Sequence, residues 1–272
     1  MTPSSPPSRS APATRSRLRA VAMPSEHGGW GLTAEPALLG LLVAPSASGA
    51  LLGLAALLAF VARTPLKVVL VDRRRHQHRA RTDLALRVLA VELAVLVVLV
   101  AAAVALTASP FWWPVLVAGP LVAVELWFDM RSRSRRLVPE LAGSVGIGAV
   151  AAMIVLANGG AGRLAVGVWL VLAARAITSI PYVRERIAQL HGRPSDPRQL
   201  VATDLVAIGI AAAAILLDPA LVVGAMAVGG VIVVQRVEGG RPVPPPKVLG
   251  MRQMAMGFGV VAATALGVAV VG

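Results

Sequence analysis

The chain has 272 residues, of which 57% are hydrophobic and 14% are charged, and its mean hydropathy is +0.76. A water-soluble domain carries about a quarter charged residues, so this composition excludes a soluble enzyme and a disordered protein. The chain has no cysteine, which also excludes disulfides, thiolate nucleophiles and cysteine-based metal sites. What remains is an all-α, polytopic membrane protein.

Residues 1–22 are rich in Ser, Pro and Arg. They lack the apolar core of a cleavable secretory signal. We expect this segment to be a disordered cytoplasmic tail, followed by a single transmembrane helical domain over residues 23–272.

Nine apolar segments follow the tail, each close to the roughly 20 residues that a membrane-spanning helix needs. The first is the shortest, and it could lie obliquely in the bilayer. The expected spans are Gly28–Ala44, Gly49–Val71, Leu84–Leu106, Phe111–Phe128, Leu137–Leu156, Leu164–Tyr182, Leu200–Leu217, Pro219–Val237 and Leu249–Val271.

The basic residues support this count, because all 26 Lys and Arg except Arg163 fall in the tail or in and around alternate connections. Cytoplasmic loops of membrane proteins carry an excess of Lys and Arg. The pattern therefore predicts a cell-membrane protein with a cytoplasmic N-terminus, cytoplasmic basic loops and an external C-terminus. The net charge of +13 is spread over five segments, which favours contact with anionic lipid headgroups over nucleic-acid binding.

Ionisable residues inside the spans are candidates for function, because burying them in a membrane is costly. They lie mostly towards the expected cytoplasmic side, which favours a cavity open to that side over a transport path. These residues are Glu35, Glu92, Glu125, Asp129, Arg175 and Asp204. The competing interpretation is that Glu92, Glu125 and Arg175 pair with each other or extend to the membrane interface.

Two connections, after the second and sixth expected spans, concentrate basic side chains at spacings of three and four residues. Arginine offers paired donors that suit phosphate or diphosphate oxygens, although such charges also serve simply to orient the helices. The residues proposed to bind a substrate are Arg63, Lys67, Asp72, Arg73, Arg175, Tyr182, Arg184 and Arg186.

Acid–base candidates are Glu26 and His27, directly before the first span, and Glu185 in the second basic connection. A Glu–His pair could transfer protons or merely cap a helix. His76 and His78 are not accompanied by a recognisable third ligand, so we expect no metal site built from them.

The chain resembles the YwiC-like family of bacterial integral membrane proteins. The resemblance rests on the opening Glu26-His-Gly-Gly-Trp30, on Arg63-Thr-Pro-Leu-Lys67, on residues 175–186 and on Pro246-Lys-Val-Leu-Gly250. This resemblance implies an integral membrane protein and does not imply a particular biochemical activity.

A more distant resemblance is to the UbiA superfamily of intramembrane prenyltransferases, which have nine helices and place their chemistry at the same two connections. In those enzymes Asp-rich motifs hold Mg²⁺ ions that bridge an isoprenoid diphosphate. Here Asp72 fits only one acidic position of the first motif. Tyr182 matches the tyrosine of the second, where Ser179, Arg186 and Leu190 replace the acids.

The resemblance thus implies a UbiA-like arrangement and a cavity that binds an isoprenoid or another amphiphile with an anionic head. Mg²⁺ is a possible cofactor, but the motifs for it are incomplete. The sequence leaves open whether the protein transfers a prenyl group. A small-solute transporter and a non-catalytic membrane assembly factor are the alternatives.

Overall fold

The computed structural model describes residues 18, 21–23, 27–77, 79–107, 109–131, 133, 136–193 and 196–271, with the backbone alone at 27 and 28. The tail expected over residues 1–22 therefore lies almost entirely outside the described part.

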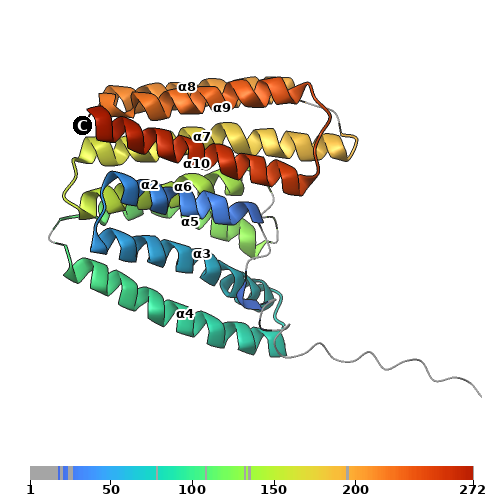
Figure 1. Ribbon diagram of the computed structural model, residues 1–272. Coiled ribbons are helices and arrows are strands. Elements are labelled where there is room, and N and C mark those ends of the chain that lie inside the picture. Colours follow the sequence, from blue (N-terminus) through green and yellow to red (C-terminus); the bar gives the residue numbers. More distant parts are fainter. Residues whose placement is uncertain are drawn as a thin grey trace, which may run out of the picture.

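All regular structure in these ranges is helical, as the composition predicts (Figure 1). The helices are α2 (His27–Val43), α3 (Ala47–Arg74), α4 (Ala80–Ala105), α5 (Trp113–Met130), α6 (Leu137–Ala157), α7 (Gly162–Leu190), α8 (Pro197–Leu217), η1 (Pro219–Leu221), α9 (Val222–Gly239) and α10 (Pro246–Val271).

Eight segments of the described chain are helical, long and apolar enough to cross a membrane: α3 to α8, η1 together with α9, and α10. The remaining apolar helix, α2, has 17 residues and is the shortest of the expected spans. The multi-pass membrane class is confirmed.

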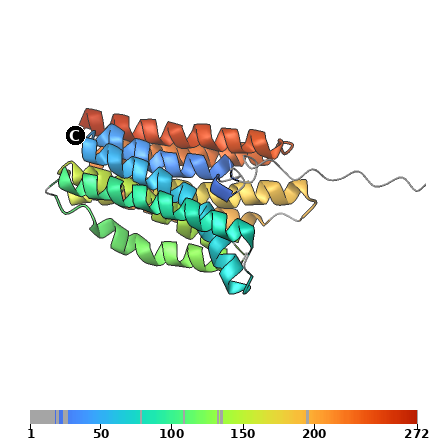
Figure 2. The ribbon, with the colours of Figure 1, turned by 90° about the horizontal axis from the view of Figure 1, so that it is seen from below.

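Consecutive long helices run in opposite directions, so their connections gather at two ends of the bundle (Figures 1 and 2). We call the end with connections 75–79, 131–136, 191–196 and 240–245 the basic end, because most Lys and Arg of the chain flank these connections. The C-terminus lies at the opposite end.

Three boundaries differ from the sequence prediction. Helix α3 continues to Arg74 and α7 to Leu190, so Asp72 and Arg186 lie inside helices instead of loops. Both side chains are buried, and contacts to neighbouring helices explain why the polar segments stay helical. The connection between the last two expected spans, which end at Val237 and begin at Leu249, shortens to 240–245, between α9 and α10.

The core lies around α6 and α7, whose small residues allow helices to approach closely, as is usual in membrane bundles. Gly148 of α6 lies under Trp169 of α7, and the Trp169 indole N–H donates to the Val145 carbonyl at 2.7 Å. Gly40 of α2 packs against Ile154 of α6. By contrast, α4 packs only against α3 among the described elements.

Candidate functional site

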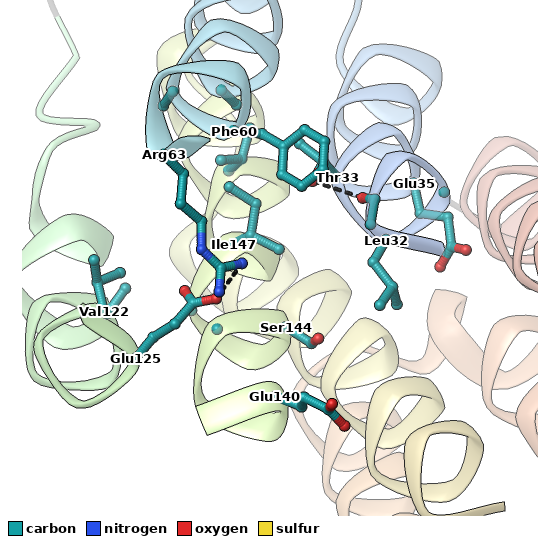
Figure 3. Close-up of a pocket in the computed structure, with 18 of the residues that line it drawn as sticks. Leu32, Thr33, Glu35, Phe60, Arg63, Val122, Glu125, Glu140, Ser144 and Ile147 are labelled. Carbon is teal, nitrogen blue, oxygen red and sulfur yellow. Dashed lines mark hydrogen bonds and ion pairs between the residues drawn. The ribbon is translucent and has the colours of Figure 1, made fainter. Parts of the chain in front are cut away.

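A large cavity of about 1490 Å³ lies between the helices, with walls formed by α2 to α7 and α10. Its volume exceeds the roughly 300–1,000 Å³ that is usual for small-molecule pockets. Figure 3 shows part of its wall, where Phe60, Leu32, Val122 and Ile147 supply apolar surface.

The polar and apolar parts of the wall are separated along the bundle. In the half of the cavity farther from the basic end, the lining is apolar and includes Leu52, Val100, Val115 and Met153. The charged lining residues stand nearer the basic end or at middle depth. These are Glu35, Arg63, Glu125, Glu140, Arg175, Arg184 and Arg193, together with His191.

One charged group joins α3 to α5. Arg63 contacts the Glu125 carboxylate at 2.6 Å and donates to Asp129 from Nε at 2.8 Å and from Nη2 at 3.2 Å. Lys67, one turn later, is 3.3 Å from Asp129. The four-residue spacings of Arg63 and Lys67 and of Glu125 and Asp129 thus place matching charges on facing helices.

Glycine at position 143 makes room for this group. A Cβ there would overlap the carboxyl carbon and oxygens of Glu125, so that carboxylate lies directly on the backbone of α6. A second pair lies on the next turn of α6, where Glu140 accepts from Arg184 of α7 at 2.9 Å. Figure 3 shows Glu125 pointing from α5 towards Arg63, with Ser144 and Glu140 on α6.

The deepest ion pair joins α2 to α7. Arg175 Nη2 lies 3.0 Å from Glu35 Oε1, and both side chains are almost fully buried. The same nitrogen donates to the Gln253 carbonyl of α10 at 2.7 Å. A Cβ at Gly257 would overlap both Glu35 and Arg175, so glycine is required at this crossing.

Buried polar side chains extend this pair towards α8 and α9. Gln235 donates to the Gln253 side chain at 3.3 Å and to Ser179 at 3.1 Å. Thr178 donates to Asp204 at 2.5 Å, and Arg236 also contacts Asp204. One network therefore links five helices at middle depth.

Asp72 lies away from the cavity, at the hairpin between α3 and α4. It accepts from Arg81 Nη2 at 2.6 Å and from the Thr82 hydroxyl at 2.8 Å. The buried carboxylate thus fixes the first turn of α4 to the last turn of α3.

The proposed substrate-binding residues therefore separate into two groups. Arg63, Arg175 and Arg184 line the cavity. The others are not among its lining residues: Lys67, Asp72, exposed Arg73, buried Tyr182 and buried Arg186.

Arg186 closes the end of α9. It donates to the carbonyl oxygens of Gly239 at 2.9 Å and Arg241 at 2.7 Å, where the last turn of a helix leaves carbonyls without partners. Tyr182, one turn earlier, donates to Glu238 at 3.4 Å. In this structure both residues hold α7 against the end of α9.

Of the acid–base candidates, Glu26 and the side chain of His27 lie outside the described residues. Glu185 accepts from Gln189 at 3.3 Å, one turn away on α7, and does not line the cavity. Within the described ranges, no three Asp, Glu or His side chains come close enough together to hold a metal ion.

Sequence reasoning missed the uncharged members of the buried network and the pair formed by Glu140. The missed residues are Thr178, Ser179, Gln235 and Gln253 in the network, and Glu140 beside Arg184. Glutamine inside an apolar span was the available signal, since a buried amide needs a partner.

Comparison with known proteins gives one family match. The model of the family described as YwiC-like protein matches residues 23–155, which include α2 to α5 and nearly all of α6. No curated protein and no solved structure matches the chain. The matched part supplies the cavity wall around Arg63 and Glu125, whereas α7 and α10 lie beyond it.

Proposed function

We propose that the cavity of this multi-pass membrane protein, whose residues 23–155 match the YwiC-like family model, binds an amphiphile with a long apolar tail and an anionic head. The observation that carries this proposal is the division of the wall. Apolar side chains line the half towards the opposite end, and the charged lining residues lie elsewhere. Apolar surface binds the tail because its removal from water or headgroups is favourable.

The head is proposed to bind where α7 reaches the basic end. Arg184, His191 and Arg193 line the cavity there. His191 and Arg193 belong to the connection after α7 and are exposed. Arginine side chains bind phosphate oxygens with two parallel hydrogen bonds. An isoprenoid diphosphate or a phospholipid would therefore place its head beside these residues.

Arg63 and Arg175 are assigned a different part in this proposal. Their carboxylate partners Glu125, Asp129 and Glu35 are only 17%, 1% and 2% exposed, whereas Glu140, the partner of Arg184, is 32% exposed. Arg63 and Arg175 therefore shape the wall and keep it close to neutral, and Arg184 is the more accessible to a ligand. His27 begins α2 at the same basic end, and Glu26 is the residue before it in the sequence. They are our proposed acid–base pair for any reaction at the head.

We also place the basic end in the cytoplasm of a cell membrane, because the positive-inside rule relates Lys and Arg to that side. A solute pathway would need polar lining towards the opposite end as well. The described lining there is apolar, which favours amphiphile binding over solute transport.

The test measures binding of geranylgeranyl diphosphate to the purified full chain by thermal shift, since a ligand that binds the folded state raises its melting temperature. Inorganic diphosphate and geranylgeraniol separate the contributions of head and tail. We expect Arg184→Gln to weaken binding of the diphosphate at least tenfold, or about 1.4 kcal/mol, and to leave the alcohol unchanged. Arg163→Gln is the matched control, because this arginine is exposed at the opposite end.

A second variant tests the tail. Gly119 lines the cavity on α5, and no atom lies within 4 Å of a Cβ placed there. Gly119→Phe should therefore fold and occupy tail space, weakening both the diphosphate and the alcohol. Gly229→Phe on α9 is the control, since that glycine also has open space and does not line the cavity. Absence of saturable binding to the unaltered chain would refute the proposed function.

A further inference from the structure

The cavity has a side that no helix closes. Its wall includes Leu93 on α4 and Val115 on α5. These two helices do not pack against each other, because α4 contacts only α3 and α5 contacts only α3 and α6. Figures 1 and 2 show α4 as the outermost helix beside α3, with α5 set apart from it.

Side chains at this boundary are both cavity lining and outer surface. Leu93 is 45% exposed and Val115 is 47% exposed, although each faces the cavity. By helical rise, Leu93 lies about 20 Å and Val115 about 22 Å along the bundle from the basic end. The opening therefore extends from the middle of α4, at Leu93, to the first turn of α5, at Val115, in the half of the bundle farther from the basic end.

The surfaces on either side of the opening are apolar. On α4 they include Val91, Val97 and Val98, and on α5 Leu116 and Val117, all of them exposed. Such surface in a membrane-spanning bundle faces lipid chains. The lining residues on this side, among them Leu96, Val100 and Gly119, are also apolar, so a hydrocarbon chain can pass between bilayer and cavity along apolar surface. Glu92, beside Leu93 on α4, is half-buried and is not among the lining residues.

We infer that the ligand is a long-chain lipid resident in the bilayer and that it enters sideways between α4 and α5. This inference rests on the proposed function and adds the source of the ligand and its route. A water-soluble amphiphile would instead reach the cavity from the basic end, where the charged lining residues lie. The cavity volume of about 1490 Å³ accommodates the chains of a lipid better than a drug-sized molecule.

The test closes the opening with a covalent bridge. Because the chain has no cysteine, Leu93→Cys together with Val115→Cys allows specific bridging by a bis-maleimide. A control bridge joins Leu205→Cys on α8 and Val233→Cys on α9, two exposed positions that do not line the cavity. Helices α8 and α9 pack against each other.

The probe is phosphatidylglycerol with a diazirine in one acyl chain, supplied in phosphatidylethanolamine–phosphatidylglycerol vesicles. Photolabelling of cavity residues is followed over time by mass spectrometry of peptides. We expect the α4–α5 bridge to slow labelling at least tenfold, and the control bridge to leave it unchanged. Labelling by a water-soluble dihexanoyl analogue should be insensitive to both bridges.

Three results would overturn the inference. Equal labelling rates with and without the α4–α5 bridge would show that the lipid enters elsewhere, while the proposed function would stand. Disulfide-linked dimers of the single variant Leu93→Cys would show that a second copy covers the opening. No labelling of cavity residues in the unbridged protein would remove the proposed function together with the inference.

Discussion

The buried pair of Glu35 and Arg175 should be among the strongest single couplings in the bundle. Its atoms lie 3.0 Å apart, and the side chains are 2% and 4% exposed. Replacing one partner leaves the other charge buried without compensation. Glu35→Gln or Arg175→Met should each lower the free energy of unfolding by about 3–5 kcal/mol, the usual cost of breaking a buried pair.

The double variant should be much less destabilised than the sum of the two single variants, because it removes both charges together. We expect a coupling free energy of about 2 kcal/mol, within the range for residues in direct contact. The double variant should still be less stable than the unaltered protein, because Arg175 also donates to the Gln253 carbonyl. That hydrogen bond is lost in both variants that replace Arg175.

Unfolding by sodium dodecyl sulfate in mixed micelles, monitored by tryptophan fluorescence, measures these free energies for all four proteins of the cycle. The control cycle uses Arg163 and Asp218, which are 3.8 Å apart with the arginine side chain 72% exposed. Exposed pairs contribute about 0–1 kcal/mol. A coupling for Glu35 and Arg175 no larger than that of the control would refute the argument from burial.

Two further predictions concern the walls of the bundle. Gly143→Ala should displace the Glu125 carboxylate that lies on its backbone and cost about 1–3 kcal/mol, as overpacking does; Gly162→Ala, where the space is open, should have no such cost in the same unfolding assay. Asp72→Ala removes the acceptor of Arg81 and should cost about 1.5–3 kcal/mol, the contribution of a charged hydrogen bond. It should also speed tryptic cleavage at connection 75–79, and an unchanged cleavage rate would show that this carboxylate does not fix α4.

The number and order of the helices could be predicted because each apolar run has the length of a membrane span and each is bounded by polar or turn-forming residues. The C-terminal end of α7 could not be predicted from the sequence. Residues 184–186 read as a charged loop, yet Arg186 is buried because it binds carbonyl groups at the end of α9. That contact depends on how α7 and α9 are placed, and a single sequence does not contain this information.

The candidate site, too, could be predicted only in part from the sequence. Spacing placed Arg63 with Lys67 and Glu125 with Asp129 on common helix faces, and the structure brings these two faces together. Glu35 and Arg175 were singled out as costly residues, but 140 positions separate them, and only the fold identifies them as partners. Gln253 was overlooked because it carries no charge, although a buried amide also needs a hydrogen-bond partner.

The position of α2 has a consequence for the order in which the protein assembles during synthesis. Helix α2 is the shortest of the expected spans and carries Glu35. Its neighbours include α6, α7 and α10, which leave the ribosome later. A lone carboxylate within a 17-residue segment inserts poorly into a bilayer, and its counterion Arg175 is translated only with α7. A truncation before α7 should therefore keep the contacts of α2 with α3 and α6 but leave Glu35 without its counterion.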